Sequence, residues 1–179
     1  MNDTLDLIKH FNWHQPSWDL FILGFWLVAS IIYAFSSGRG RILTILVSTY
    51  IARLFVEQMP GVVEKVNEKV VFLQGGYAEL ALFVVLFLVL FLFLSKYGFR
   101  TSLEGRHLTA IVFGIGFAVL QVGLFVSIVL TMLPESLTSQ FAEFTHILFI
   151  IQPAPLIWMV LPLVYLVVLG KFFSDRAEL

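Results

Sequence analysis

The chain has 179 residues, of which 59% are hydrophobic and 13% are charged, with a formal net charge of −1 and no cysteine. Its mean hydropathy of +0.94 excludes a water-soluble globular domain. The balanced charge argues against nucleic acid as a partner. The lack of cysteine excludes disulfides, thiol chemistry and thiolate metal sites.

Charged residues gather between long, continuous apolar runs. A backbone that spans a membrane must satisfy its polar groups internally, so these runs are expected to be helices. We therefore predict an all-α fold: one integral membrane domain, a polytopic transmembrane helix bundle of four or five spans with interfacial amphipathic helices. The expected spans cover residues 18–35, 42–56, 77–94, 108–133 and 156–170.

The N-terminal segment MNDTLDLIKH is acidic and lacks the basic start of a secretory signal, so the first apolar run is interpreted as a retained helix. Residues 1–17 are expected to form a short amphipathic helix on the membrane surface. His10 and His14 in this segment have the i, i+4 spacing of a metal pair. No third ligand accompanies them, so a surface pair is favoured, and no metal or other cofactor is predicted.

Three of the polar connections between the apolar runs carry structural signals of their own. The basic turn SSGRGR at 36–41 predicts that the first two spans are antiparallel. Within residues 57–76, Pro60-Gly61 breaks the preceding helix and valines follow at helical spacing, which favours an interfacial helix, with a loose loop as the alternative. Residues 134–152 predict an interfacial or partly re-entrant helix that stops near Gln152, because the prolines that follow restrict the residues before them.

The run 108–133 is the expected centre of the bundle, because it is 26 residues long, uncharged and rich in small residues. Small residues let helices approach closely in lipid. At ~100° per residue, one face holds Ala110, Gly114, Ala118 and Gln121, and a nearly opposite face holds Gly116, Gly123, Ser127 and Thr131. We expect Gly114 to tolerate a larger side chain less well than any position of the bulky run 77–94, which is expected to face lipid.

The last run, 156–170, contains Pro162, which is expected to kink it. It is interpreted as a fifth span, with a re-entrant hairpin as the alternative. Seven lysines and arginines lie on the side of the turn 36–41, the loop 95–107 and the C-terminal tail, against three on the other side. The positive-inside rule then predicts an N-terminus outside and a C-terminus in the cytoplasm.

Four charged residues are expected toward the external ends of the helices: Asp19, Arg53, Glu57 and Glu79. We call these residues the outer cluster. An ionised group at membrane depth requires a partner, so one of the three carboxylates is expected to pair with Arg53. The outer cluster is either an ion or proton-linked vestibule or, as we favour, a structural ion pair.

Gln121 is the strongly polar side chain nearest the middle of a span, and we favour an interhelical hydrogen bond over a role in ligand selectivity. His107 and His146 are expected on opposite sides of the membrane, so they cannot bind the same metal ion or haem. The chain contains no nucleotide-binding, nucleophile-elbow or zinc-protease motif, and we predict that it is not an enzyme.

Several short motifs occur in a recognisable order. Asp19 opens a helix, Gly38-Arg39-Gly40-Arg41 forms a tight turn, and Ala52-Arg53 ends the second helix. Gly105-Arg106-His107 then leads into Phe113-Gly114 of the glycine-rich fourth run. This layout, over about residues 18–133, resembles the colicin V production protein (CvpA) family of small bacterial inner-membrane proteins. The chain differs at Arg106-His107, where an Asp-Arg pair is usual, and in the additional run 156–170.

The resemblance implies a non-enzymatic protein of the bacterial inner (cytoplasmic) membrane that is linked to secretion of a toxin or bacteriocin or to envelope maintenance. The expected partners are the lipid bilayer, envelope or secretion proteins and, as an open alternative, further copies of the chain in a homo-oligomer. The resemblance transfers no catalytic residue. The alternative function is a small channel or transporter subunit with the outer cluster as its mouth.

Overall fold

The computed structural model describes residues 18–36, 39–73, 76–97 and 108–177, with side chains described for 20–34, 43–71, 73, 76–97 and 114–168. Every regular element in these ranges is helical, which confirms the all-α prediction for this part of the chain. The expected surface helix at 1–17, including His10 and His14, lies outside the described residues, as does His107.

Six helices of ten or more residues form the body of the protein. They are α2 (Trp18–Ser36), α3 (Arg39–Gln58), α4 (Pro60–Lys69), α5 (Tyr77–Tyr97), α6 (Leu108–Thr131) and α9 (Ala154–Ala177). Four short elements complete the described fold: the 3-10 turn η1 (Val71–Leu73), α7 (Glu135–Thr138), α8 (Glu143–Thr145) and the π-helix η2 (His146–Ile150).

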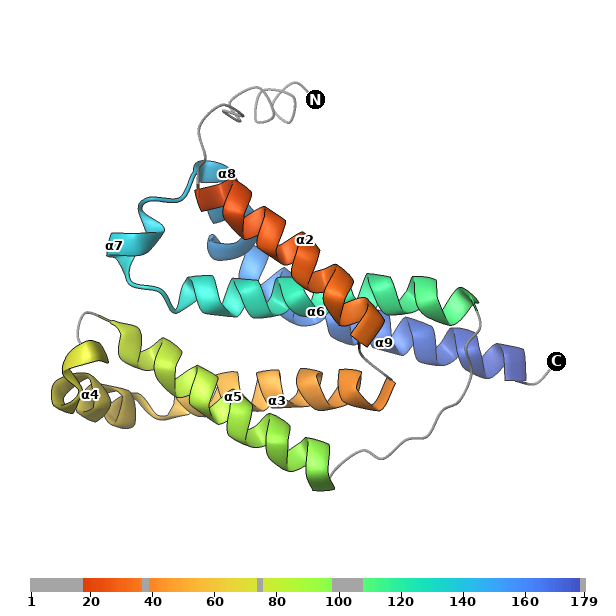
Figure 1. Ribbon diagram of the computed structural model, residues 1–179, viewed down its shortest axis with the longest axis horizontal. Coiled ribbons are helices and arrows are strands. Elements are labelled where there is room, and N and C mark those ends of the chain that lie inside the picture. The colour runs from red at the N-terminus through yellow and green to blue at the C-terminus, as the bar shows by residue number, and fades with distance from the viewer. Residues whose placement is uncertain (1–17, 37–38, 74–75, 98–107, 178–179) are drawn as a thin grey trace.

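The long helices form two groups (Figure 1). α6 packs against α2 along one side and against α9 along another, and η2 packs at its C-terminal end. α3 packs mainly against α5, and only a short stretch of α3 approaches α6. α6 therefore contacts both groups, as expected for a central helix.

Two described segments are long and apolar enough to cross a membrane, namely α5 and the Gly114–Thr131 part of α6. A third span results if Glu143–Ile150 and Ala154–Val168, which meet at a bend of 49°, are counted together. α2 contributes only the shorter apolar stretch Leu20–Ala34. The described structure thus supports a membrane-embedded protein with two or three candidate spans, fewer than the four or five predicted.

α3, the predicted span 42–56, is absent both from these candidates and from the shorter apolar helices of the described residues. Its sequence, RGRILTILVSTYIARLFVEQ, interrupts the apolar residues with hydroxyl and charged side chains. By hydropathy alone, α3 is therefore not identified as a span.

The polar segment after α3 folds as the predicted helix and not as the alternative loop. α4 has Pro60 at its first turn, where the missing N–H of proline costs nothing and its fixed φ fits the helix. Val70 is extended and ends α4. Gly76, with φ of +99°, then turns the chain into α5, and a Cβ there would lie 3.3 Å from Cβ of Pro134. Glycine suits both the backbone conformation and the close approach.

The segment 134–152 is less regular than predicted. It forms the separate turns α7 and α8 and then the π-helix η2, which ends at Ile150, close to the predicted stop near Gln152. α9 then starts at Ala154 and continues through Pro162. The bend of 49° lies at the break before α9.

Three aromatic side chains join η2 to its neighbours. The ring of Phe149 stacks on Trp158 of α9 with centroids 5.4 Å apart and meets the edge of Trp26 of α2 at 5.8 Å. Trp158 donates its indole N–H to the carbonyl of Leu148 at 2.7 Å, and Trp26 donates to the carbonyl of Val119 at 3.1 Å. These bonds satisfy the indole groups inside an apolar core.

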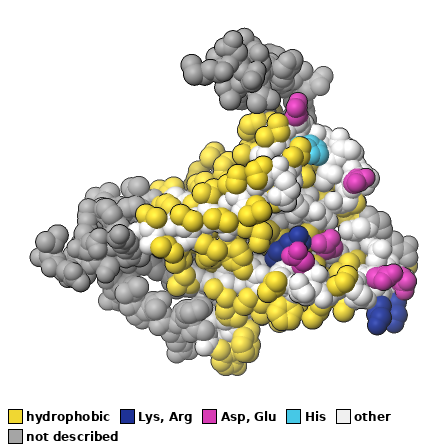
Figure 2. All heavy atoms as spheres, turned by 180° about the vertical axis from the view of Figure 1, so that it is seen from behind, with side chains coloured by type: hydrophobic (Ala, Val, Ile, Leu, Met, Phe, Trp, Pro, Cys, Tyr) yellow, Lys and Arg dark blue, Asp and Glu magenta, His cyan; other side chains and the backbone are white. Residues whose placement is uncertain are grey.

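α5 leaves most of its surface uncovered, as its bulky composition predicts. Ala78 and Phe83 are its buried residues. The exposed side chains include Val89 at 58%, Leu92 at 64% and Phe93 at 61% of their full area. Figure 2 shows hydrophobic side chains spread over one face of the molecule.

Candidate functional site

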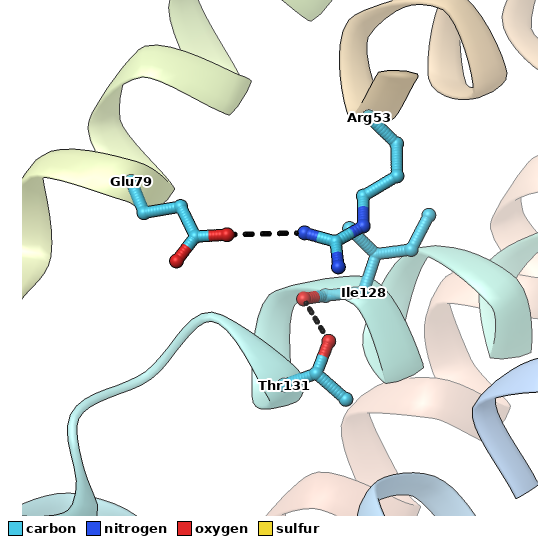
Figure 3. A network of polar contacts seen from close by, with 4 residues as sticks. All are labelled: Arg53, Glu79, Ile128 and Thr131. Carbon is cyan, nitrogen blue, oxygen red and sulfur yellow. Dashed lines mark hydrogen bonds and ion pairs between the residues drawn. The ribbon is translucent and has the colours of Figure 1, made fainter. Parts of the chain in front are cut away.

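The strongest charged contact in the outer cluster is an ion pair between α3 and α5. Arg53 Nη1 lies 3.1 Å from Glu79 Oε1 (Figure 3). Their side chains remain 24% and 41% exposed. Among the described carboxylates of the outer cluster, Glu79 is therefore the one that pairs with Arg53.

The other two members of the outer cluster are placed differently. Glu57 is exposed and lies four residues after Arg53 on α3. Asp19 lies in the first turn of α2, and its side chain is outside the described set. The described residues thus join Arg53 and Glu79 but do not show a closed four-residue site.

A second polar region lies inside the bundle on α3. The side chains of Thr44, Ser48 and Thr49 are 3%, 0% and 0% exposed. Thr49 Oγ1 donates to the carbonyl of Ile45 at 2.8 Å, the usual way for a hydroxyl inside an apolar helix to satisfy its proton.

Gln121 of α6 meets this polar region, as its predicted interhelical hydrogen bond requires. Its Nε2 donates to Thr49 Oγ1 at 3.4 Å, and its side chain is 2% exposed. Gln121 Oε1 and Ser48 Oγ are buried and form no hydrogen bond with the described residues. The contact between α3 and α6 therefore contains one oxygen atom, Gln121 Oε1, with unused hydrogen-bonding capacity.

The small residues of α6 differ in what they contact. A Cβ on Gly123 would lie 2.6 Å from Cε3 of Trp158, and one on Gly116 would lie 2.9 Å from Cζ of Tyr165. Ala118 on the other predicted face is 1% exposed. A Cβ on Gly114 would meet no described atom within 4 Å, so the close contact predicted at Gly114 is not found there. The side chain of Ala110 is outside the described set.

Sequence reasoning missed the side chains that tie α3 and η2 to the rest of the bundle. Tyr50 of α3 donates its hydroxyl to the carbonyl of Met159 in α9. Ser127 of α6 donates to the carbonyl of Phe149 at 2.7 Å. Ser127 was recognised only as a small residue. The signals in the sequence for this bond were the hydroxyl of Ser127 within an apolar run and the predicted helix break near Gln152, where carbonyls lack helical partners.

His146 is held within the α7–η2 segment. Its Nε2 lies 2.8 Å from the carbonyl of Thr138, which requires a proton on Nε2. Within the described ranges, no group of three or more His, Asp or Glu side chains has the arrangement of a metal site. The described polar groups thus offer one ion pair near the helix ends and neutral hydrogen-bonding groups in the middle of the bundle.

Comparison of the chain with models of protein families, with curated proteins and with solved structures found no match.

Proposed function

We propose that the chain is a polytopic protein of the bacterial inner membrane that crosses the bilayer five times, with α2, α3, α5, α6 and α9 as its spans. A 20-residue helix such as α3 is ~30 Å long, which matches the hydrocarbon layer. α3 is too polar to face lipid on all sides. Its contacts with α5 and α6 shelter its hydroxyl groups, which supports its role as an inner span.

The proposed orientation has the N-terminus outside and the C-terminus in the cytoplasm. In Figure 1, the end of α2, the start of α3, the end of α5 and the end of α9 lie toward the same side of the molecule. The basic turn 36–41, the basic loop 95–107 and the C-terminal tail continue from these ends in sequence. This grouping supports a cytoplasmic location for that side.

We further propose that the protein acts without catalysing a reaction, as a CvpA-like component of toxin or bacteriocin secretion or of envelope maintenance. The observation that carries this proposal is the uncovered apolar surface of α5, where Val89, Leu92 and Phe93 are each more than half exposed. Such a surface is stable only against lipid tails or another transmembrane segment. The proposed partners are therefore lipids, an envelope or secretion protein, or a second copy of the chain.

Photo-crosslinking in native membranes tests this proposal. A photoreactive amino acid at Val89 or Leu92 is expected to capture a specific membrane protein. The same amino acid at Phe83, which is 0% exposed, is the control and should capture no other protein. Capture of lipid alone from Val89 and Leu92 would contradict a role through protein partners at α5 and would leave lipid as its only neighbour.

A small channel or transporter subunit is the second candidate. The specific observation in its favour is the combination of the Arg53–Glu79 pair near the helix ends with the buried polar groups of α3. In reconstituted liposomes, this function predicts an ion flux that Arg53→Ala or Glu79→Gln abolishes. Glu57→Gln is the matched control, because Glu57 is exposed and lies one turn away on α3. Absence of flux from the unmodified chain would exclude this candidate.

A further inference from the structure

The contact between Thr49 and Gln121 lies in the middle of the bundle. α3 runs from Arg39 to Gln58 and α6 from Leu108 to Thr131, so each residue is close to the midpoint of its helix. Both side chains are almost completely enclosed, with exposures of 0% and 2%. Polar groups at this depth cannot reach the solvent at either membrane surface.

Hydrogen bonding at this contact is incomplete. Thr49 Oγ1 gives its proton to the carbonyl of Ile45 and accepts from Gln121 Nε2, which leaves Gln121 Oε1 without a donor. One end of the Gln121 amide is therefore unmatched in the structure. The adjacent residue Ser48 adds a second buried oxygen without a partner at the same level.

The chemistry of the contact selects a neutral ligand. The unmatched group of this contact is a single uncharged amide oxygen, whereas Ca²⁺ and Mg²⁺ sites in proteins also include carboxylates. Arg53 lies one turn from Thr49 along α3, and its positive charge disfavours a cation. The 3.4 Å separation between Gln121 Nε2 and Thr49 Oγ1 is long for a hydrogen bond, and α3 approaches α6 only over a short stretch.

We propose that this contact binds a water molecule inside the bundle, with Gln121 Oε1 as its principal acceptor. Buried waters in proteins satisfy polar groups that have no other partner. The site presumes the membrane insertion proposed above and is compatible with either proposed function. It makes the middle of the bundle a hydrated point between α3 and α6.

Water-edited solid-state NMR on the full chain in phosphatidylcholine–phosphatidylglycerol bilayers tests the site. Glutamine side chains and tryptophan indoles carry the ¹⁵N label, and loss of a signal in Gln121→Met assigns Gln121. Gln140 and Gln152 are exposed and serve as hydrated references. The indole of Trp158, 8% exposed and bonded to Leu148, is the dry reference. Magnetisation from water should reach the Gln121 amide at least ~5-fold faster than the Trp158 indole, as expected of a side chain bound to water.

A Gln121 amide as slow as the Trp158 indole would overturn the water site and leave the membrane proposal intact. A Trp158 indole as fast as Gln140 would mean that the bundle is not enclosed, which would overturn both. Ser30→Ala is a matched control variant, because Ser30 is a buried hydroxyl that already donates to the carbonyl of Trp26 at 2.6 Å. This substitution should leave the transfer to Gln121 unchanged, and a loss of transfer would argue against a local site.

Discussion

At the scale of single residues, Gly123 and Trp158 make a close contact between α6 and α9. The indole of Trp158 occupies the space that a side chain at position 123 would need, and its N–H caps a carbonyl of η2. Two turns earlier in α6, the ring of Tyr165 likewise occupies the space that a side chain at Gly116 would need. The two glycines thus let α9 lie close to α6, and the aromatic rings fill the space between the helices.

Gly123→Val is expected to destabilise the protein, because it must displace Trp158 and break the indole bond to Leu148. Overpacking of this kind costs about 1–3 kcal/mol. Unfolding in mixed detergent micelles measures the effect. Gly114→Val is the matched control, since a Cβ there meets no described atom within 4 Å. Equal losses at both positions would contradict the packing described for α6 and α9.

Ser127→Ala is expected to leave the carbonyl of Phe149 without its donor beside the helix break. Because Ser127 is 1% exposed and the bond is 2.7 Å long, the loss should be about 0.6–2 kcal/mol, the range for hydrogen bonds inside membrane proteins. Ser139→Ala, which removes an exposed hydroxyl, is the control for the same unfolding measurement. A Ser127→Ala variant as stable as its control would show that this bond does not hold η2 in place.

Part of this residue-level detail could be predicted from the sequence. The periodicity of 108–133 correctly identified Gln121 as a side chain that meets another helix and Gly116 and Gly123 as members of one face. It could not rank Gly114 against Gly123, because the rings that meet Gly116 and Gly123 come from α9, more than 30 residues later. It likewise offered Arg53 three carboxylates, and only the fold brings Glu79 to it.

At the scale of elements, α3 and α5 form a pair with opposite characters. α5 is bulky, apolar and largely uncovered, whereas α3 is polar for a membrane helix and buries its hydroxyl groups. α3 makes most of its helix contacts with α5, and the Arg53–Glu79 pair joins the two helices near the start of α5. In a bilayer, this pairing would keep the polar face of α3 away from lipid.

The Arg53–Glu79 pair is expected to contribute little to stability in detergent solution, because both side chains remain partly exposed. A double-mutant cycle with Arg53→Met and Glu79→Gln should give a coupling free energy of about 0.2–1 kcal/mol. Rising salt should reduce this coupling. A salt-independent coupling well above this range would instead indicate a pair buried from solvent.

Element boundaries followed the sequence closely where apolar runs were long. The predicted runs 77–94 and 108–133 match α5 and α6 to within three residues at each end. The segment 134–152 did not follow its apolar stripe, because its carbonyls are bound by Ser127 and Trp158 from other helices and it breaks into short turns. Local periodicity carries no information about such distant partners.

At the scale of the whole molecule, α6 links a group formed with α2, α9 and η2 to the α3–α5 pair. α6 contributes the aromatic contact of Phe125 with Phe83 and Phe87 and the Gln121–Thr49 hydrogen bond. Tyr50 of α3 adds a direct hydrogen bond to α9. In the proposed arrangement, the acidic ends of the helices face outward and the basic connections face the cytoplasm. We propose that α3 crosses the membrane inside this bundle, so that the chain crosses five times.

Labelling of single cysteines with a membrane-impermeant maleimide tests this claim most directly, because the chain has no cysteine of its own. Thr4→Cys and Ser139→Cys should react from outside in intact cells. Ser102→Cys, in the loop between α5 and α6, and a cysteine added after Leu179 should react only after the membrane is permeabilised. Reaction of Ser102→Cys from outside, or of Thr4→Cys and the added cysteine from the same side, would contradict five spans with the N-terminus outside.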